Sequence, residues 1–264
     1  MKFIKELYQY REFLRTNVKK EIRGKYKASF LGVLWSFINP LLQVLVYAIV
    51  FPYIMRVKTP HYLVFLICGI IPWTWFITSL SGGTTSITNN GNLIKKVYFP
   101  REILPISTVT SGVVNFSISC IIIIIFALLD GVGISWHIVF LPLIMILQYI
   151  FSLSLVFLTA AFNVYVKDVE YMVNFILNLL FYATPILYSA DMFKGTKFAW
   201  IFKLNPMAYF VESYRNIFYA HHIPGLKTMG ILLIIGIVLL TISYSVFKKL
   251  EKRFAEEIWW KLQL

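Results

Sequence analysis

Long stretches without a charged residue alternate with short charged segments along the whole chain. A helix needs about 20 apolar residues to cross the ~30 Å hydrocarbon core of a bilayer. Six stretches reach that length, and the two longest contain polar or glycine-rich portions, so each is expected to cross only once. The pattern predicts six membrane-spanning helices, at about residues 30–55, 61–80, 104–129, 137–163, 170–189 and 228–249.

Amphipathic segments flank the predicted spans. Near the N-terminus, apolar residues recur every three or four positions, at Phe3, Leu7, Tyr10, Leu14 and Val18. This spacing predicts that residues 1–27 hold an amphipathic helix in the membrane interface. Residues 251–264 form a tail with apolar residues four apart. Simple anchoring and docking of another protein both explain these segments, and the sequence leaves both open.

Residues 191–227 differ from the spans because glycine and proline divide them into short apolar pieces. None is long enough to cross a membrane, so we expect re-entrant or interfacial helices. Irregular backbone at membrane depth must be shielded by protein or line a polar cavity. This segment is therefore expected to form a lid or vestibule on the outer face. The candidates for an outer gate are Pro185, Tyr188, Asn205 and Pro206.

Composition and charge support an all-α integral membrane protein. The chain is 59% hydrophobic and 14% charged, whereas soluble domains have about 25% charged residues. Most of the 25 lysines and arginines lie in residues 1–27, 95–102, 167–170 and 248–264, which a six-span topology places on one side. By the positive-inside rule both termini are expected to be cytoplasmic. Topology and contact with membrane lipids then explain the net charge of +13, and we expect no nucleic-acid partner.

The sequence carries no recognisable catalytic constellation. It lacks the GxxxxGK[ST] phosphate loop, so it does not bind ATP by that route. Its two cysteines and four histidines lack the spacing of a metal site. No charged residue interrupts a predicted span, so the relay of an ion-coupled carrier is missing. We expect no enzyme activity, metal or cofactor in this chain, and an energy source outside it.

The polar residues within the spans are uncharged. Aromatic faces stack on sugar rings, and amides bond to sugar hydroxyls, so these residues are candidates for a path through the membrane. Amides also hold neighbouring membrane helices together, and both explanations stay open. The channel candidates are Trp35, Asn39, Gln43, Tyr47, Asn174, Asn178 and Tyr182.

Two motifs resemble a known family. Residues 23–40, RGKYKASFLGVLWSFINP, resemble the RYK-x-S-x-LG-x-LW-x-x-x-x-P segment that begins the first span of permeases for bacterial surface polysaccharides. Residues 95–105, KKVYFPREILP, resemble the KK-x-x-FPR-x-x-x-P segment of the same permeases. These proteins are the transmembrane subunits of ABC exporters for lipid-linked O-antigen, teichoic acid and capsule-like polymers. One departure is Lys167, where the family usually has an arginine.

The resemblance implies a six-span domain, residues 28–250, that pairs as a homodimer in the bacterial cytoplasmic membrane. Two separate ATPase subunits would bind ATP and magnesium. Residues 83–103 would form a cytoplasmic gate or coupling segment that meets the ATPase. The residues that match this role are Lys95, Lys96, Tyr98, Phe99, Pro100 and Arg101.

The resemblance also implies a contact with the substrate lipid. Leu31 and Gly32 match a surface loop that meets the lipid pyrophosphate. Arg23, Lys25 and Lys27 are three cations beside this loop and are suited to bind phosphate. They also satisfy the positive-inside rule without any ligand, and the sequence leaves both explanations open.

The function implied is ATP-driven export of a polyprenyl-pyrophosphate-linked polysaccharide. O-antigen is the expected substrate, and teichoic acid or a capsule-like polymer is the alternative. A drug- or lipid-exporting permease would share the topology but lack the two motifs. A membrane glycosyltransferase of the GT-C type would need an acidic site on the outer face, which the sequence does not offer.

Overall fold

The computed structural model describes residues 8–24, 35–54, 59–193, 195–197 and 199–260. Within these ranges every regular element is a helix. The long helices are α3 (Trp35–Ile54), α4 (Tyr62–Thr84), α6 (Ile103–Leu129), α7 (Leu141–Tyr165), α8 (Asp168–Ala183) and α11 (Leu226–Leu250). They follow the order of the six predicted spans.

Four helical stretches are long and apolar enough to cross a membrane, among the residues that the structure describes. Two of them are α4 and α6. The third is α7 with the short helix η3 (Trp136–Phe140) before it. The fourth begins with α11 and continues to Glu257. Ile38–Phe51 of α3 is a shorter apolar helix, and α8 has 16 residues. The multi-pass helical architecture is therefore confirmed.

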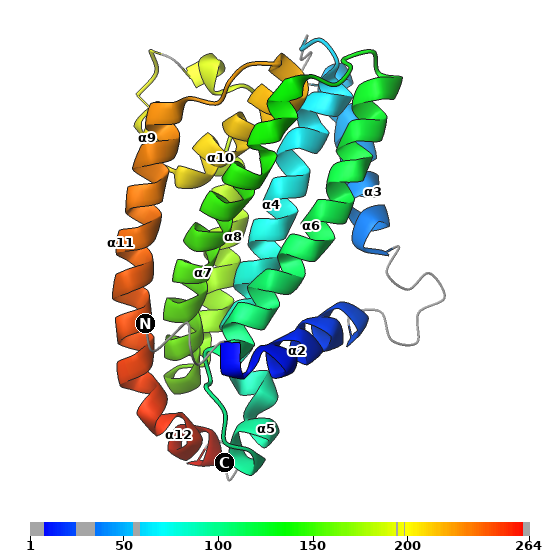
Figure 1. Ribbon diagram of the computed structural model, residues 1–264. Coiled ribbons are helices and arrows are strands. Elements are labelled where there is room, and N and C mark those ends of the chain that lie inside the picture. Colours follow the sequence, from blue (N-terminus) through cyan, green and yellow to red (C-terminus); the bar gives the residue numbers. More distant parts are fainter. Residues whose placement is uncertain (1–7, 25–34, 55–58, 194, 198, 261–264) are drawn as a thin grey trace.

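Helix α4 lies at the centre of the bundle (Figure 1). It packs against α3, α6, α7, α8 and the short helix α10 (Pro206–Arg215). Two glycines allow close contact with its neighbours. A Cβ at Gly83 would lie 2.4 Å from Val156 Cγ1, and a Cβ at Gly112 of α6 would lie 2.7 Å from Ser79 Oγ. Helices α6 and α11 instead expose isoleucine and leucine side chains on their outer sides.

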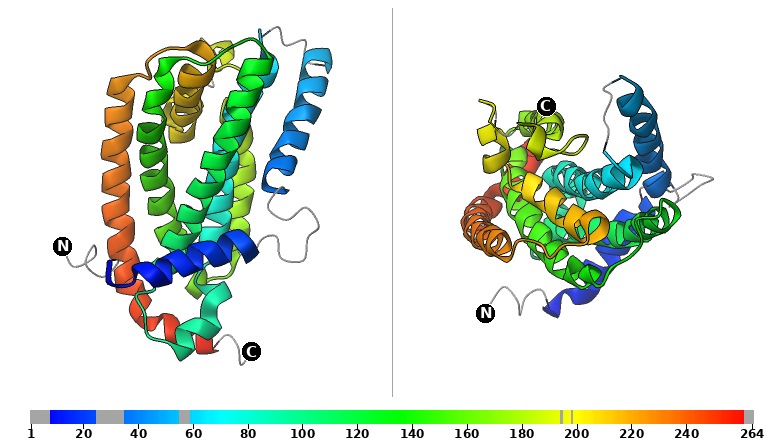
Figure 2. Two further views of the ribbon diagram at one scale, coloured as in Figure 1. Left: turned by 45° about the vertical axis from the view of Figure 1, so that its right-hand side comes forward. Right: turned by 90° about the horizontal axis from the view of Figure 1, so that it is seen from above.

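Three terminal or connecting helices lie together at one end of the bundle (Figure 2). Helix α2 (Arg11–Gly24) crosses this end and packs against α6. Phe13 and Leu14 of this helix, and Tyr10 just before it, lie against the core. Helix α5 (Gly91–Lys96) follows the turn η2 (Thr88–Asn90), and the C-terminal helix α12 (Phe254–Trp260) packs against α5.

Helix α8 ends inside the fifth predicted span, residues 170–189. That span was expected to reach residue 189, but the helix stops at Ala183 and Thr184 is extended. Pro185 explains the difference, because a proline disfavours helical backbone in the residue before it and lacks an N–H. The chain then forms η4 (Ala190–Phe193), α9 (Ala199–Leu204), α10 and η5 (Asn216–Ala220).

We expect Gly83→Ala to lower the thermal stability of the purified protein. The added Cβ would collide with Val156, and overpacking of this kind costs ~1–3 kcal/mol. Gly230→Ala in α11 is the matched control, because a Cβ there has nothing within 4 Å. Equal midpoints of thermal unfolding in detergent for the two variants would contradict the packing described for α4.

Candidate functional site

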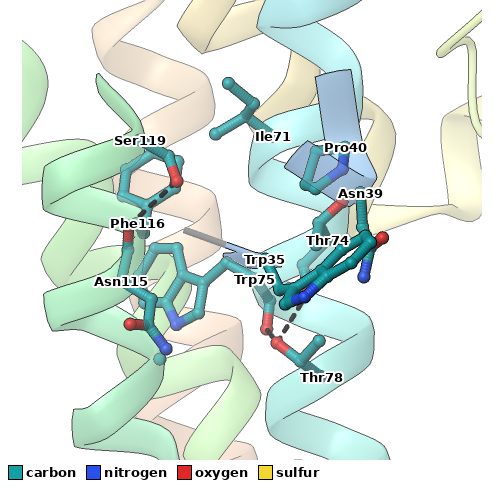
Figure 3. Close-up of a pocket in the computed structure, with 11 residues that line it drawn as sticks. Trp35, Asn39, Pro40, Ile71, Thr74, Trp75, Thr78, Asn115, Phe116 and Ser119 are labelled. Carbon is teal, nitrogen blue, oxygen red and sulfur yellow. Dashed lines mark hydrogen bonds between the residues drawn. The ribbon is translucent and has the colours of Figure 1, made fainter. Parts of the chain in front are cut away.

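A pocket of about 360 Å³ lies between α3, α4 and α6. Trp35 and Asn39, both predicted as channel residues, contribute from α3. Trp75 and Thr78 contribute from α4, and Asn115 contributes from α6. Figure 3 shows these side chains turned into the same space. The pocket lining carries amides, hydroxyls and indole rings but no charged side chain.

Two polar groups in this pocket have hydrogen-bonding capacity to spare. Trp75 is 3% exposed, and its indole N–H finds no partner among the described residues. The same holds for the side-chain oxygen of Asn115. Thr78 differs, because its hydroxyl donates to the carbonyl of Thr74 at 2.7 Å. Since buried polar groups are usually paired, these two uncharged groups make the pocket a candidate binding site.

The other channel candidates lie outside this pocket. Gln43 donates to the hydroxyl of Tyr47 at 3.3 Å, within α3. Asn174 accepts a hydrogen bond of 2.6 Å from Ser81 and so joins α8 to α4. Asn178 and Tyr182 are exposed on α8. Asn174 therefore contributes to helix packing, whereas the α8 surface remains accessible in the single chain.

Residues 95–101 are the part of the predicted segment 83–103 that holds the named residues, and they are called the coupling segment below. They comprise the last two residues of α5 and the chain that leads towards α6. Lys95, Lys96 and Tyr98 are exposed, with Tyr98 92% accessible. Phe99 is buried, and its ring centroid lies 4.8 Å from that of Phe13 in α2. The structure thus divides this predicted site into a projecting part and an anchored part.

The anchored part extends to residues that the sequence did not single out. Arg101 donates to the backbone carbonyl of Glu251. Next to it, Glu102 is fully buried, and its Oε1 lies 2.9 Å from Lys248 Nζ. Pro100 is half-buried between these contacts. One signal was present in the sequence, because Glu102 and Lys248 directly flank two of the charge-free stretches.

All four outer-gate candidates belong to one joint near the end of α8. Asn205 donates to the hydroxyl of Thr184 at 2.8 Å and accepts from the N–H of Met207 at 3.0 Å, so it caps α10. Pro206 is the first residue of that helix. Tyr188 donates to the carbonyl of Tyr182. The Pro185 carbonyl accepts from Arg215.

Arg215 was not predicted as a site residue, yet it is the centre of this joint. It is 3% exposed and donates to the carbonyls of Phe65, Pro185 and Ile186. Its guanidinium carbon lies 3.4 Å from the centroid of the Phe65 ring, in a cation–π contact. Only its position in an apolar segment distinguished it in the sequence.

Most of the predicted pyrophosphate site lies outside the described residues, namely Lys25, Lys27, Leu31 and Gly32. Arg23 is described only as part of α2. Within the described ranges, no three histidine, cysteine or acidic side chains come together as a metal site would require.

Comparison with known proteins identifies the family. Residues 12–219 match the family described as ABC-2 type transporter. The O-antigen export system permease protein RfbA of Myxococcus xanthus is 36% identical over 259 residues, which is 98% of this chain and 100% of that protein. An RfbA permease of Klebsiella pneumoniae is 38% identical over 239 residues, covering 90% of this chain and 91% of its own length. The chain belongs to the ABC-2 type transporter family and is a membrane permease rather than an enzyme.

Proposed function

We propose that this chain is the permease of an ATP-driven exporter that moves polyprenyl-pyrophosphate-linked O-antigen across the bacterial cytoplasmic membrane. The observation that carries the proposal is the similarity over the full length of the Myxococcus O-antigen permease. An uncharged polar pocket between apolar helices agrees with a neutral glycan as cargo. ATP and magnesium would bind to a separate ATPase subunit.

The proposed topology has six crossings, with α3 and α8 added to the four long apolar helices. The end that carries α2, α5 and α12 holds Lys95, Lys96, Lys249 and Lys252. The positive-inside rule supports the proposal that this end faces the cytoplasm. Helices α9 and α10 would then re-enter from the outer side, with the gate at the joint around Arg215.

We propose a homodimer with the glycan path between the two copies. Helix α3 packs mainly on α4 and exposes Leu42, Leu45 and Ile49. Helix α8 exposes Phe175 and Tyr182. A second copy would cover part of these faces, and the pocket of Trp35, Trp75 and Asn115 would face the passing sugars. The cations around Arg23 would hold the pyrophosphate at the cytoplasmic interface.

The function itself is tested by deleting the gene in its host. We expect surface O-antigen to disappear and lipid-linked O-antigen to accumulate inside the cell, because the glycan is made on the cytoplasmic side. Immunoblots of surface polysaccharide and extracts of lipid-linked intermediates measure both. Normal surface O-antigen together with loss of a teichoic acid or capsule would assign a different polymer.

The projecting part of the coupling segment is expected to bind the ATPase. Truncating Lys95, Lys96 and Tyr98 together to alanine removes three exposed side chains, of which tyrosine is a type enriched at interface hot spots. A loss of about 2 kcal/mol would weaken ATPase binding roughly thirtyfold. Co-purification and ATP-dependent export measure this effect. The control, Lys203→Ala with Lys227→Ala, removes exposed charges at the opposite end. Equal ATPase recovery from both proteins would refute the contact.

The pocket is tested with Asn115→Leu, which keeps the approximate size of the side chain but removes its amide. Loss of one hydrogen bond, worth about 0.5–1.5 kcal/mol, should raise the lipid-linked glycan concentration for half-maximal export by roughly two- to tenfold. Ser117→Ala is the control on the same helix, because Ser117 bonds only to the carbonyl of Val113 among the described contacts. An unchanged concentration dependence for Asn115→Leu would exclude this residue from glycan binding.

A further inference from the structure

The start of α6 and the end of α11 are joined by a lysine between two glutamates. Lys248 Nζ lies 2.9 Å from Glu102 Oε1 and 3.0 Å from Glu102 Oε2. The same nitrogen lies 2.9 Å from Glu251 Oε1. Glu102 is fully buried, whereas Lys248 is partly accessible. This cluster of Glu102, Lys248 and Glu251 is called the ionic joint below.

Further contacts fix the ionic joint to neighbouring elements. Arg101 donates to the backbone carbonyl of Glu251, which binds the coupling segment to the chain after α11. The hydroxyl of Tyr165, at the end of α7, donates to the carbonyl of Leu250 at 2.9 Å. The ionic joint therefore lies where α6, α7 and α11 converge.

The C-terminal helix α12 packs against the same end of α11. Phe254 of α12 and Phe247 of α11 are both fully buried, with ring centroids 5.4 Å apart. Helix α12 also packs against α5, whose last two residues belong to the coupling segment. The coupling segment is thus held from two directions by the C-terminal part of the chain.

The side chains in and beside the coupling segment make three kinds of contact. Lys95, Lys96 and Tyr98 are exposed, so a partner protein has access to them. Phe99 packs on Phe13 through apolar contact, which has no preferred direction. The ionic joint is directional, because a buried carboxylate that leaves its lysine would be uncompensated. The ionic joint is therefore the contact of this region with α11 that would be costly to break.

We propose that Lys248 is a positioning residue that makes the coupling segment and α11 move together during ATP-driven export. The inference rests on the proposed function and adds the route by which movement at the ATPase contact reaches the last span. The segments it joins are 146 residues apart in the sequence. Stability alone does not require such a pair, since well-packed apolar residues often replace a buried ion pair without loss.

The test uses the permease with its own ATPase in lipid vesicles that contain lipid-linked O-antigen. The quantity measured is the amount of glycan exported per ATP hydrolysed. Lys248→Met breaks the joint but leaves Glu102 buried without a partner, so a second variant combines Glu102→Gln with Lys248→Met. Lys248→Arg preserves the charge, and Lys249→Met removes the adjacent exposed lysine as the matched control.

The expected result is a change in coupling rather than in assembly. The double variant should bind the ATPase and hydrolyse ATP near the wild-type rate, while export per ATP falls roughly fivefold or more, as for loss of a typical coupling interaction. Lys248→Arg and Lys249→Met should keep the wild-type ratio.

An unchanged ratio in the double variant would overturn the proposal. So would a parallel fall in ATP hydrolysis, export and thermal stability, since that pattern shows a purely structural role. The wild-type vesicles separate this inference from the proposed function. If they export no O-antigen with an active ATPase, the proposed function fails and this inference fails with it.

Discussion

The end of the bundle opposite α2, α5 and α12 depends on hydrogen bonds to the carbonyls of a backbone stretch that leaves helical geometry inside the protein. After α8 ends, Pro185 prevents the regular ladder of helical hydrogen bonds from continuing. Arg215 instead donates to the carbonyls of Pro185 and Ile186, and the hydroxyl of Tyr62 donates to that of Leu187 at 2.8 Å. Each such carbonyl left buried and unpaired would cost about 1–3 kcal/mol. These two side chains therefore make it possible for α8 to stop where it does.

The same requirement determines the shape of the segment that follows. Arg215 reaches these carbonyls only because α10 is buried against α4 and α7. Asn205 begins α10 and also donates to the carbonyl of Ala183 at 3.1 Å, so one residue both caps this helix and closes the previous one. Phe65 of α4 supplies a carbonyl and a ring face to the same guanidinium. Any opening at this end must consequently displace the ends of α4, α8 and α10 together.

The sequence predicts the long helices well, because a long run without charged residues indicates a segment that is unfavourable in water. The prediction fails where contacts between distant parts of the chain determine the structure. The run that contains α8 has no charge up to residue 190, so length alone placed the end of the helix too late. Arg215 was not singled out because its acceptors, the carbonyls of Phe65, Pro185 and Ile186, come from other parts of the chain. Glu102 and Lys248 are 146 residues apart, and no local pattern pairs them.

Arg215 and Lys248 are buried or partly buried cations at the two ends of the bundle, and each needs hydrogen-bond acceptors for its charge. They find these acceptors in different ways. Arg215 is satisfied mainly by backbone carbonyls, whose positions are set by the helices that they end, so its contacts resist rearrangement. Lys248 is satisfied by the carboxylates of Glu102 and Glu251, which lie on side chains and can follow the helices that carry them. The pocket around Trp75, between α3, α4 and α6, has no charged side chain in its lining. The ionic contacts of Arg215 and Lys248 thus lie where helices end, whereas the pocket between α3, α4 and α6 is lined by uncharged groups.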